Sequence, residues 1–328
     1  MHIALTGSIA TDHLMTYKGR FADSLVVDQL DKIALSFLVE DLEIHRGGVA
    51  ANIAFGMANL GERPILVGAA GEDFTEYRSW LERHGVDCDS VHISETRHTA
   101  RFVCTTDDQM AQIATFYAGA MSEAREIELG PVATRVGGLD LVVISSNDPE
   151  AMLRHTEECR TRKIPFAADP SQQLAFMDGE SIRELIDGAA YLFTNEYEAA
   201  LTEQKTGWSS DEIAKRVQTR VITKGKNGAL IATDGEEPFE IFVANEVRKA
   251  DPTGVGDAFR AGFLSGLSWG LGHERSAQTG SMLATYVVET VGTQEYELGR
   301  RRFLERFTQA YGATASEEIE PHLTCPRP

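Results

Sequence analysis

The stretch DPTGVGDAFRAGF, residues 251–263, joins a glycine-rich turn to the beginning of a helix pattern. Gly254 and Gly256 stand just before the acidic residue Asp257, and small residues recur on one face of the pattern that follows. Glycine allows backbone N–H groups to approach an anion closely, and the N-terminus of a helix carries partial positive charge. The stretch therefore predicts an anion hole at the start of a helix, formed by Gly254, Val255 and Gly256.

An anion hole with a carboxylate at its edge suits phosphoryl transfer. The N–H groups would stabilise charge on the moving phosphoryl group, and Asp257 would accept the proton of an attacking hydroxyl. An isolated Gly-x-Gly is a weak motif, however, and an ordinary capped helix after a glycine turn is the alternative. A second motif is needed to decide between the two.

That second motif is RGGVAANIAFGMANLGERPILVGAAG, residues 46–71. Together with the first stretch it resembles the two signatures of the ribokinase-like (PfkB) kinase family, which occur in this order and about 200 residues apart. The matching positions are Gly47, Gly48, Asn52, Ala54, Gly61 and Gly71. The resemblance covers nearly the whole chain and implies a kinase that uses ATP and Mg²⁺.

Short β-rich runs alternate with helical patterns along the chain. The runs are HIALTG, PILVGAA, LDLVVISS, PFAAD, YLFT, RVITK and GALIAT, and the helical patterns lie near 48–60, 149–162, 180–187, 195–205, 209–218 and 254–290. Such alternation is typical of a mainly parallel sheet with helices on both faces. It predicts an α/β fold, which agrees with the three-layer α/β/α domain of ribokinase-like kinases.

Two segments interrupt the alternation. Residues 12–45 contain the β-like runs HLMTY and KIALSFLV, and residues 98–117 have the pattern of a hairpin that turns at Asp107 and Asp108. We expect these segments to form one small β-sheet lid, and residues 1–11, 46–97 and 118–328 to form the kinase domain. In several members of the family such a lid is also the dimer interface, so the resemblance implies a homodimer. Residues 313–328 are expected to be loosely ordered.

The turn of the hairpin determines where two lid aromatics point. With Asp107 and Asp108 as a two-residue turn, Phe102 lies opposite Ile113, and Phe116 points to the other face. This register predicts an adenine site shared by two protomers, with Phe102 from one and Phe116 from its partner. A bulge or a three-residue loop would reverse the parity of one strand and let both rings serve one chain.

The run TNEYE places Asn195 and Glu198 at a junction between a strand and a helix. The pair resembles the family's Asn-x-x-Glu element, which implies that Asn195 contacts ATP and that Glu198 holds Mg²⁺ through water. A helix cap followed by a solvent-facing Glu is the alternative.

Two further features belong to the nucleotide side. Thr223, Gly225 and Gly228, in ITKGKNGA, resemble the family's nucleotide loop, although a tight hairpin alone would give the same pattern. Asp251 and the carbonyl of Thr253 resemble part of a monovalent-cation site for K⁺. In relatives a later loop, here around residues 291–295, completes that site.

The expected substrate side begins with Asp12, which follows the first strand and resembles the family carboxylate that binds sugar hydroxyls. Gly48 and Asn52 should complete this polyol clamp, because a backbone N–H and an amide bind hydroxyls without adding charge. A turn aspartate is the alternative for Asp12. Phe102 and Phe116 could enclose a purine, although aromatic residues are also common in half-buried strands.

Six stretches closely resemble bacterial ribokinase-like adenosine kinases: TGSIATDHL, HRGGVAAN, HTARF, AQIATFY, ADPSQQLA and DPTGVGDAFRAGF. The resemblance implies that the γ-phosphoryl group of ATP is transferred to the 5′-hydroxyl of adenosine, with Asp257 as the base. The residues implied around the nucleoside are Ser8, Asp12, Gly48, Asn52, Phe102, Phe116, Gln172 and Gln173. The last two could instead be exposed loop glutamines.

The composition argues against several other classes of protein. The chain has 328 residues with 31 basic and 50 acidic side chains, and this net charge of −19 disfavours binding to nucleic acids or anionic membranes. No run approaches the ~20 apolar residues of a membrane span. Cys88, Cys104, Cys159 and Cys325 lack metal-ligand spacing, which favours a reducing cytoplasm.

Three alternatives in function remain. A ribokinase- or fructokinase-type sugar kinase would use the same machinery. A nucleotide-binding dehydrogenase is disfavoured, because no G-x-G-x-x-G turn follows the first strand. A non-catalytic nucleotide sensor is also disfavoured, because Gly254, Gly256, Asp257, Asn195 and Glu198 are all present.

Overall fold

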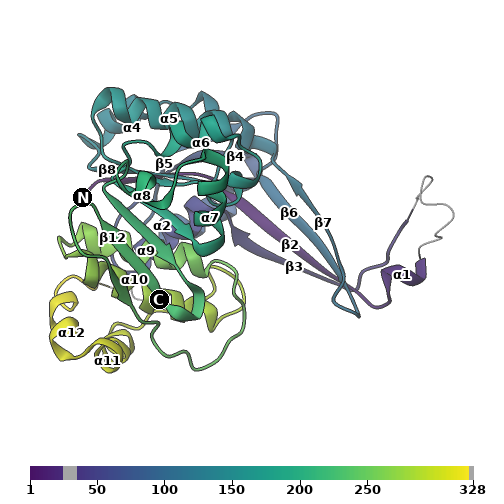
Figure 1. The fold of residues 1–328 in the computed structure, drawn as a ribbon. Coiled ribbons are helices and arrows are strands. Elements are labelled where there is room, and N and C mark those ends of the chain that lie inside the picture. Colours follow the sequence, from purple (N-terminus) through teal and green to yellow (C-terminus); the bar gives the residue numbers. More distant parts are fainter. Residues whose placement is uncertain (25–34, 325–328) are drawn as a thin grey trace.

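The computed structural model describes residues 1–24 and 35–324, and it consists of an α/β body from which a narrow β-sheet extends (Figure 1). The body contains one nine-stranded sheet in the order β13-β12-β11-β10-β9-β8-β1-β4-β5. All neighbouring pairs from β11 to β5 are parallel, whereas β12 and β13 are antiparallel additions at one edge. The expected mainly parallel sheet is therefore confirmed. The strands are Ile3–Thr6 (β1), Ile65–Gly71 (β4), Asp87–Ser94 (β5), Leu141–Ser145 (β8), Phe166–Asp169 (β9), Tyr191–Asn195 (β10), Thr219–Thr223 (β11), Ala229–Thr233 (β12) and Phe239–Ile241 (β13).

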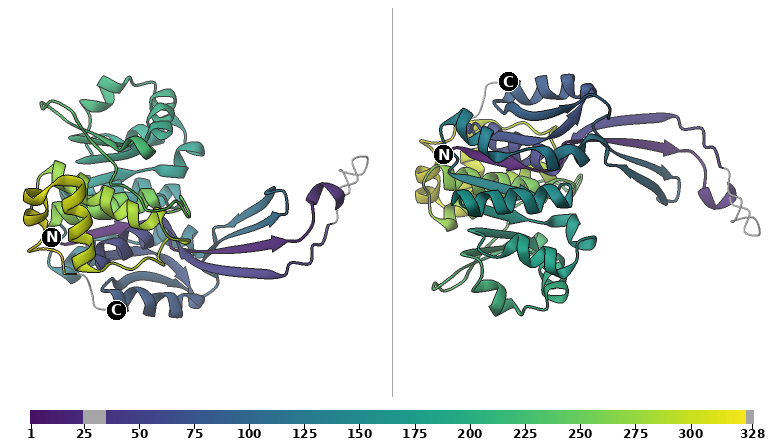
Figure 2. Two further views of the ribbon diagram at one scale, coloured as in Figure 1. Left: turned by 90° about the horizontal axis from the view of Figure 1, so that it is seen from below. Right: turned by 90° about the horizontal axis from the view of Figure 1, so that it is seen from above.

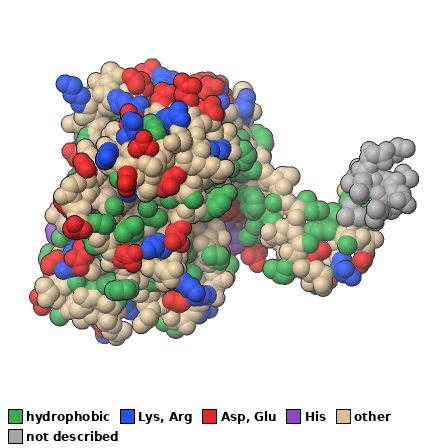
Figure 3. Space-filling view, in the orientation of Figure 1, with side chains coloured by type: hydrophobic (Ala, Val, Ile, Leu, Met, Phe, Trp, Pro, Cys, Tyr) green, Lys and Arg blue, Asp and Glu red, His purple; other side chains and the backbone are tan. Residues whose placement is uncertain are grey.

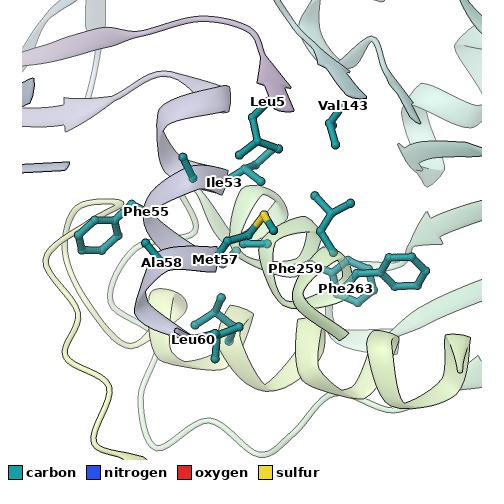
Figure 4. Close-up of a cluster of buried hydrophobic side chains, with 14 of the residues drawn as sticks. Leu5, Ile53, Phe55, Met57, Ala58, Leu60, Val143, Phe259 and Phe263 are labelled. Carbon is teal, nitrogen blue, oxygen red and sulfur yellow. The ribbon is translucent and has the colours of Figure 1, made fainter. Parts of the chain in front are cut away.

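Helices cover both faces of this sheet and form two apolar cores. On one face, helix α2 and helix α9 pack over β1 and β8, where Ile53, Met57, Phe259 and Phe263 lie in one apolar cluster with Leu5 and Val143 (Figure 4). The helices of this face are Val49–Asn59 (α2), Thr75–His84 (α3), Val255–Ser268 (α9), His273–Val288 (α10), Arg300–Tyr311 (α11) and Ala313–Ile319 (α12). The other face carries Leu129–Val136 (α4), Pro149–Arg162 (α5), Gly179–Ile186 (α6), Glu196–Thr206 (α7) and Ser210–Ala214 (α8). Burial of these faces supplies the main apolar driving force for folding.

The structure corrects two expectations about the C-terminal part of the chain. The helical pattern over residues 254–290 is two helices, because Gly270, with φ 76°, ends α9 and Gly272 begins α10. The loosely ordered tail expected from residue 313 is helical over Ala313–Ile319, because Ala315 and Ile319 are buried in the core. Residues 325–328 of that tail lie outside the described residues. No helix in the described part of the chain has the length and apolar character needed to cross a membrane.

The second sheet is the expected lid, and it projects from the body in every view (Figures 1 and 2). Its strand order is β3-β2-β6-β7, with bounds Ala10–Tyr17 (β2), Asp41–Gly47 (β3), Ala100–Asp107 (β6) and Gln112–Tyr117 (β7). A short helix, Phe21–Ser24 (α1), lies beyond the far end of the lid strands. The two segments expected to form the lid are joined by parallel pairing of β2 with β6.

The expectation that the run KIALSFLV forms a strand of the lid is wrong for its described residues. Residues 35–39 of the run KIALSFLV are not in a strand, and residues 32–34 lie outside the described residues. Phe37 instead packs against Tyr17 and Phe21, with ring centroids 4.9 Å from each. The apolar character of this run serves an aromatic cluster at the far end of the lid, and the pairing strand begins later, at Asp41.

The expected register of the lid hairpin is also wrong. Phe102 lies directly opposite Phe116, and Thr106 lies opposite Gln112, so the loop has three residues, 108–110. The Asp107 carboxylate accepts hydrogen bonds from the backbone N–H groups of residues 109 and 111, at 2.8 and 2.9 Å, which stabilises the longer loop. Both rings therefore point to the same face of one chain. The geometric argument for an adenine site shared between protomers does not hold.

Candidate active site

The glycine-rich turn forms the N-terminus of α9, as the sequence predicts. Gly254 has φ 75°, a left-handed conformation that glycine adopts at little cost. A Cβ atom at this position would lie only 2.8 Å from the side chain of Thr293, so space as well as conformation requires glycine. Val255 is the first helical residue, and Asp257 lies in the first turn. The N–H groups of this turn carry the positive end of the helix dipole.

Asp257 is a half-buried carboxylate with a polar partner. Its side chain is 15 % exposed, and Oδ2 accepts a hydrogen bond of 2.9 Å from Nδ2 of Asn52. Burial raises the pKa of Asp257 to about 7, with a further contribution from the carboxylates of Asp169 and Glu198. The guanidinium of Arg260 and the amide of Asn52 act in the opposite direction. A carboxylate with a pKa near neutrality can accept a proton at physiological pH.

Two residues that the sequence analysis did not identify fix the orientation of Asn52. Its Oδ1 accepts hydrogen bonds from Oγ1 of Thr293, at 2.9 Å, and from Nε2 of Gln294, at 3.0 Å. The amide nitrogen must therefore face Asp257. From the sequence, the loop around 291–295 is expected only to complete the cation site, and no motif marks Gln294 as a partner of Asn52.

Ser8 and Gly48 lie together at the start of α2. Gly48 has φ 94°, and a Cβ atom there would lie 2.5 Å from the carbonyl oxygen of Ser8. The hydroxyl of Ser8 accepts a hydrogen bond of 3.0 Å from the backbone N–H of Val49. The turn after β1 thus caps the helix that carries Asn52. The structure brings three of the expected substrate residues, Ser8, Gly48 and Asn52, to one place.

Four side chains form a row across one face of the lid. His45, Asp12, Phe102 and Phe116 are direct neighbours in register on β3, β2, β6 and β7. Residues paired in this way share a face of the sheet. Burial raises the pKa of Asp12, and the nearby His45 opposes this shift. His45 was not identified from the sequence, although it directly precedes the Arg-Gly-Gly of the second motif.

The two glutamines expected at the substrate differ in their surroundings. Gln173 donates a hydrogen bond of 2.7 Å from Nε2 to the carbonyl oxygen of Asn147. Gln172 is exposed, and Ser171 before it has a left-handed φ of 45°. The backbone therefore turns sharply after β9 and gives the two side chains different exposure.

Asn195 and Glu198 form a capping box at the start of α7. The side chain of Asn195 accepts a hydrogen bond from the N–H of Glu198 at 2.8 Å, and the carboxylate of Glu198 accepts one from the N–H of Asn195 at 2.7 Å. This is the helix cap named above as the alternative. The charge of Glu198 also contributes to the raised pKa of Asp257, so the same carboxylate acts on the site electrostatically.

The remaining residues expected on the nucleotide side lie at or after the end of β11 and before α9. Thr223 ends β11, and a tight turn containing Gly225 leads through Gly228 into β12. Asp251 accepts hydrogen bonds from the N–H of Thr253, at 2.8 Å, and of Gly292, at 3.2 Å. The second contact joins the two loops expected to supply cation ligands. Among the described residues, no three His, Cys, Asp or Glu side chains are grouped so that they could hold a metal ion.

Comparison with known proteins adds independent evidence. Residues 10–298 match the model of the pfkB family carbohydrate kinases. The nucleoside kinase of Methanocaldococcus jannaschii is 29 % identical over 270 residues, which cover 82 % of this chain and 87 % of that protein. The structure of Burkholderia thailandensis nucleoside kinase in complex with inosine is 33 % identical, with a TM-score of 0.83, and the match covers 95 % of this chain and 99 % of the other.

A more distant structure shows the fold alone. Arabidopsis thaliana ribokinase, solved with ribose and ATP, has a TM-score of 0.77 at 20 % identity. The family match spans most of the chain and includes both glycine motifs. The protein belongs to the pfkB family of carbohydrate kinases, with the ribokinase-like fold.

Proposed function

We propose that the protein is an adenosine kinase, which transfers the γ-phosphoryl group of ATP to the 5′-hydroxyl of adenosine and yields AMP and ADP for purine salvage. The observation that carries the catalytic part of this proposal is the half-buried Asp257, held by Asn52 in the first turn of α9. Its pKa of about 7 allows it to accept the proton of the attacking hydroxyl. The family membership supports ATP as the phosphoryl donor.

The residues of the site divide the work of the reaction. Asp257 accepts the hydroxyl proton as the oxygen attacks the γ-phosphorus, and the N–H groups of Gly254, Val255 and Gly256 stabilise the charge on the transferred group. Asn52, fixed by its partners, holds the Asp257 carboxylate in one orientation. Asn195, Thr223, Gly225 and Gly228 are proposed to bind ATP.

The lid row supports a nucleoside over a simple sugar. Phe102 and Phe116 lie opposite each other on the face that also carries Asp12. A carboxylate beside two flat rings can bind a vicinal diol and a purine in one molecule. Two similar proteins are nucleoside kinases, and one of them was solved with inosine. The choice of adenosine among nucleosides rests on the resemblance to bacterial adenosine kinases. In this proposal Ser8, Gly48, Gln172 and Gln173 complete the nucleoside site.

A phosphate-transfer screen tests the substrate. The purified protein, with labelled ATP and Mg²⁺, should phosphorylate adenosine with a higher kcat/KM than inosine, other nucleosides, ribose or fructose. A preference for inosine would keep the nucleoside kinase and remove adenosine specificity. Equal rates with ribose would favour a ribokinase-type enzyme, and the absence of transfer to every acceptor would favour a nucleotide sensor.

Mg²⁺ and K⁺ are proposed as the ions of the reaction. Mg²⁺ keeps several waters and binds through one or two carboxylates plus substrate phosphates, so Glu198 and ATP provide a suitable site without a cage of protein ligands. When bound, Mg²⁺ neutralises charge on the phosphates. Asp251 and the carbonyl of Thr253, next to the loop at 291–295, are proposed to hold K⁺. Removal of Mg²⁺ by a chelator should abolish transfer, and exchange of K⁺ for a large organic cation should lower it.

A homodimer formed through the lid is also proposed. Apolar side chains are exposed along the narrow lid (Figure 3), among them Leu42 at 54 % and Ile44 at 58 %. Both lie on the face opposite the row of Asp12, as shown by the pairing of Ile44 with His13. A second copy of the chain would cover this face and leave the substrate face in place. We place the enzyme in the cytoplasm, where the buried thiols of Cys88, Cys104 and Cys159 stay reduced.

A further inference from the structure

Arg260 and Asp169 form an ion pair in the interior, and the mechanism given above uses neither residue. Nη2 of Arg260 lies 2.6 Å from Oδ1 of Asp169, and the two side chains are 9 % and 0 % exposed. Taking two charges out of water costs free energy that their mutual attraction often fails to recover. A buried ion pair is therefore a poor device for stability alone, and its location becomes the relevant question.

The guanidinium of Arg260 lies against the anion-hole turn. A Cβ atom on Gly256 would lie 2.8 Å from Nη1 of Arg260, so the absence of a side chain at Gly256 makes room for the cation. The same Nη1 is 4.0 Å from Oδ1 of Asp257, which lies one turn earlier on α9. The guanidinium thus lies between two carboxylates, in direct contact with Asp169 and about 4 Å from Asp257.

The charged groups around Asp257 come from three elements. Arg260 on α9 lowers the pKa of Asp257, whereas Asp169 at the end of β9 and Glu198 at the start of α7 raise it, and α2 contributes the neutral amide of Asn52. Among these four groups of the described structure, Arg260 is the only cation. One guanidinium thus interacts with three carboxylates. Its distance from Asp257 determines how far it lowers the pKa of that carboxylate.

We propose that Arg260 is a positioning residue for the Asp257 carboxylate, and that Asp169 holds the guanidinium short of direct contact with that carboxylate. This inference rests on the proposed function, in which Asp257 is the base. A cation at about 4 Å favours the ionised form that accepts the proton. A direct salt bridge would stabilise that form further and make the carboxylate a weaker proton acceptor. Asp169 prevents this contact by binding the guanidinium itself.

The test is the pH dependence of kcat, measured at saturating ATP and nucleoside, in two variants that should shift it in opposite directions. Arg260→Gln removes the cation, so the fall of kcat on acidification should begin at higher pH, by about one unit or more. At acidic pH, where kcat falls in both proteins, the variant should have a kcat roughly tenfold lower than the wild type, and its kcat should recover at alkaline pH. Asp169→Asn removes one carboxylate and frees Arg260 to approach Asp257, so the same limb should move to lower pH.

Three controls separate this role from a general loss of structure. Arg260→Lys keeps the charge and should keep the limb close to its wild-type position. Arg220→Gln removes another buried arginine, which lies 3.8 Å from Glu203, and should leave the limb unshifted. If Arg260→Gln fails to fold with Asp169 unpaired, the double variant Arg260→Gln/Asp169→Asn replaces it. Its limb should still lie above that of the wild type, because Arg260 affects Asp257 more strongly than Asp169 does.

Limbs that stay in place, or that move in the same direction in the two single variants, would overturn the role of Arg260 and Asp169. Uniformly lower kcat at every pH would do the same, because it would indicate a merely structural pair. The proposed function fails by a different result, which is the absence of phosphoryl transfer to adenosine in the acceptor screen described above. The two ideas can therefore be rejected separately.

Discussion

As the proposed base, Asp257 has to meet two opposing requirements, because a base must be ionised before the reaction and must accept a proton during it. Burial raises its pKa to about 7, while Asn52 and Arg260 keep the ionised form accessible. The activity of the enzyme should therefore rise as the pH increases through about 7, when the carboxylate loses its proton, and fall as the pH decreases.

The first prediction concerns this carboxylate. Asp257→Asn keeps the shape of the side chain but cannot accept a proton, so kcat should fall by about 10²–10⁴-fold. Binding of adenosine, measured by calorimetry, should stay close to that of the wild type. Near-normal kcat in this variant would remove Asp257 from the role of base.

The second prediction concerns Asp12, which belongs to the row of side chains on the lid. In the proposed site it is remote from the transferred phosphoryl group. Asp12→Ala should weaken adenosine binding by about 1.5–3 kcal/mol for each hydrogen bond lost from the charged carboxylate. Each 1.4 kcal/mol corresponds to about tenfold in Kd. Calorimetric titration measures this change, and an unaltered affinity would exclude Asp12 from the nucleoside site.

The residues of the site differ in how far the sequence could predict them. Gly254 and Asp257 are adjacent parts of one motif, and a left-handed turn before a helix leaves a clear sequence pattern. Gln294 reaches Asn52 from 242 positions away, and this contact depends on how two distant loops pack. Arg260 lies inside the motif, on α9, but its partner Asp169 lies at the end of β9, so only the folded chain shows the pair.

Among the elements, the lid shows most clearly where sequence patterns are insufficient. The presence of β6 and β7 was predictable from alternating residues, but their register depends on one loop. The Asp107 carboxylate accepts hydrogen bonds from two backbone N–H groups, and Met110 adopts a left-handed φ of 62°. The loop therefore has three residues instead of the expected two. One added residue reverses the parity of a strand, which moved Phe116 to the face of Phe102.

The third prediction tests this register through neighbouring residues of β7. Phe116→Leu should raise the KM for adenosine by about 10-fold or more, because a stacked base contributes on the order of 1–3 kcal/mol. Thr115→Ala, on the opposite face, should leave KM unchanged. In both variants kcat should stay near the wild-type value, because the lid residues do not touch the transferred group in the proposed site. Equal effects of the two substitutions would contradict the observed pairing of Phe102 with Phe116.

At the scale of the whole molecule, the parallel body was the most predictable part. Seven β-rich runs and the intervening helices follow the alternation that a doubly covered sheet requires. The tail was less predictable, because Ala315 and Ile319 are buried only when α12 packs on the finished core. The short segment of α12 has few apolar residues, so its sequence alone gives no strong helical pattern. Its burial depends on the apolar surface of the other helices against which it packs.

The fourth prediction concerns the assembly. Ile44→Asp places a charge on the exposed face of the edge strand β3, opposite the substrate row, and should shift the proposed dimer to monomer in analytical ultracentrifugation. Lys18→Ala, at an exposed ion pair near the end of β2, serves as the control and should leave the mass unchanged. A wild-type protein that sediments as a monomer at micromolar concentration would end the dimer proposal.

The row of His45, Asp12, Phe102 and Phe116 takes one side chain from each lid strand, while Asp257 and the anion hole belong to the body. In the proposed site, the aromatic residues that would enclose the base therefore lie on the lid, and the residues of phosphoryl transfer lie on the body. The lid consists of two separate segments of the chain, so a chimera can replace both segments and keep the sequence of the body. Grafting residues 10–47 and 98–117 onto another kinase of this fold would measure how much of the choice of acceptor lies in the lid.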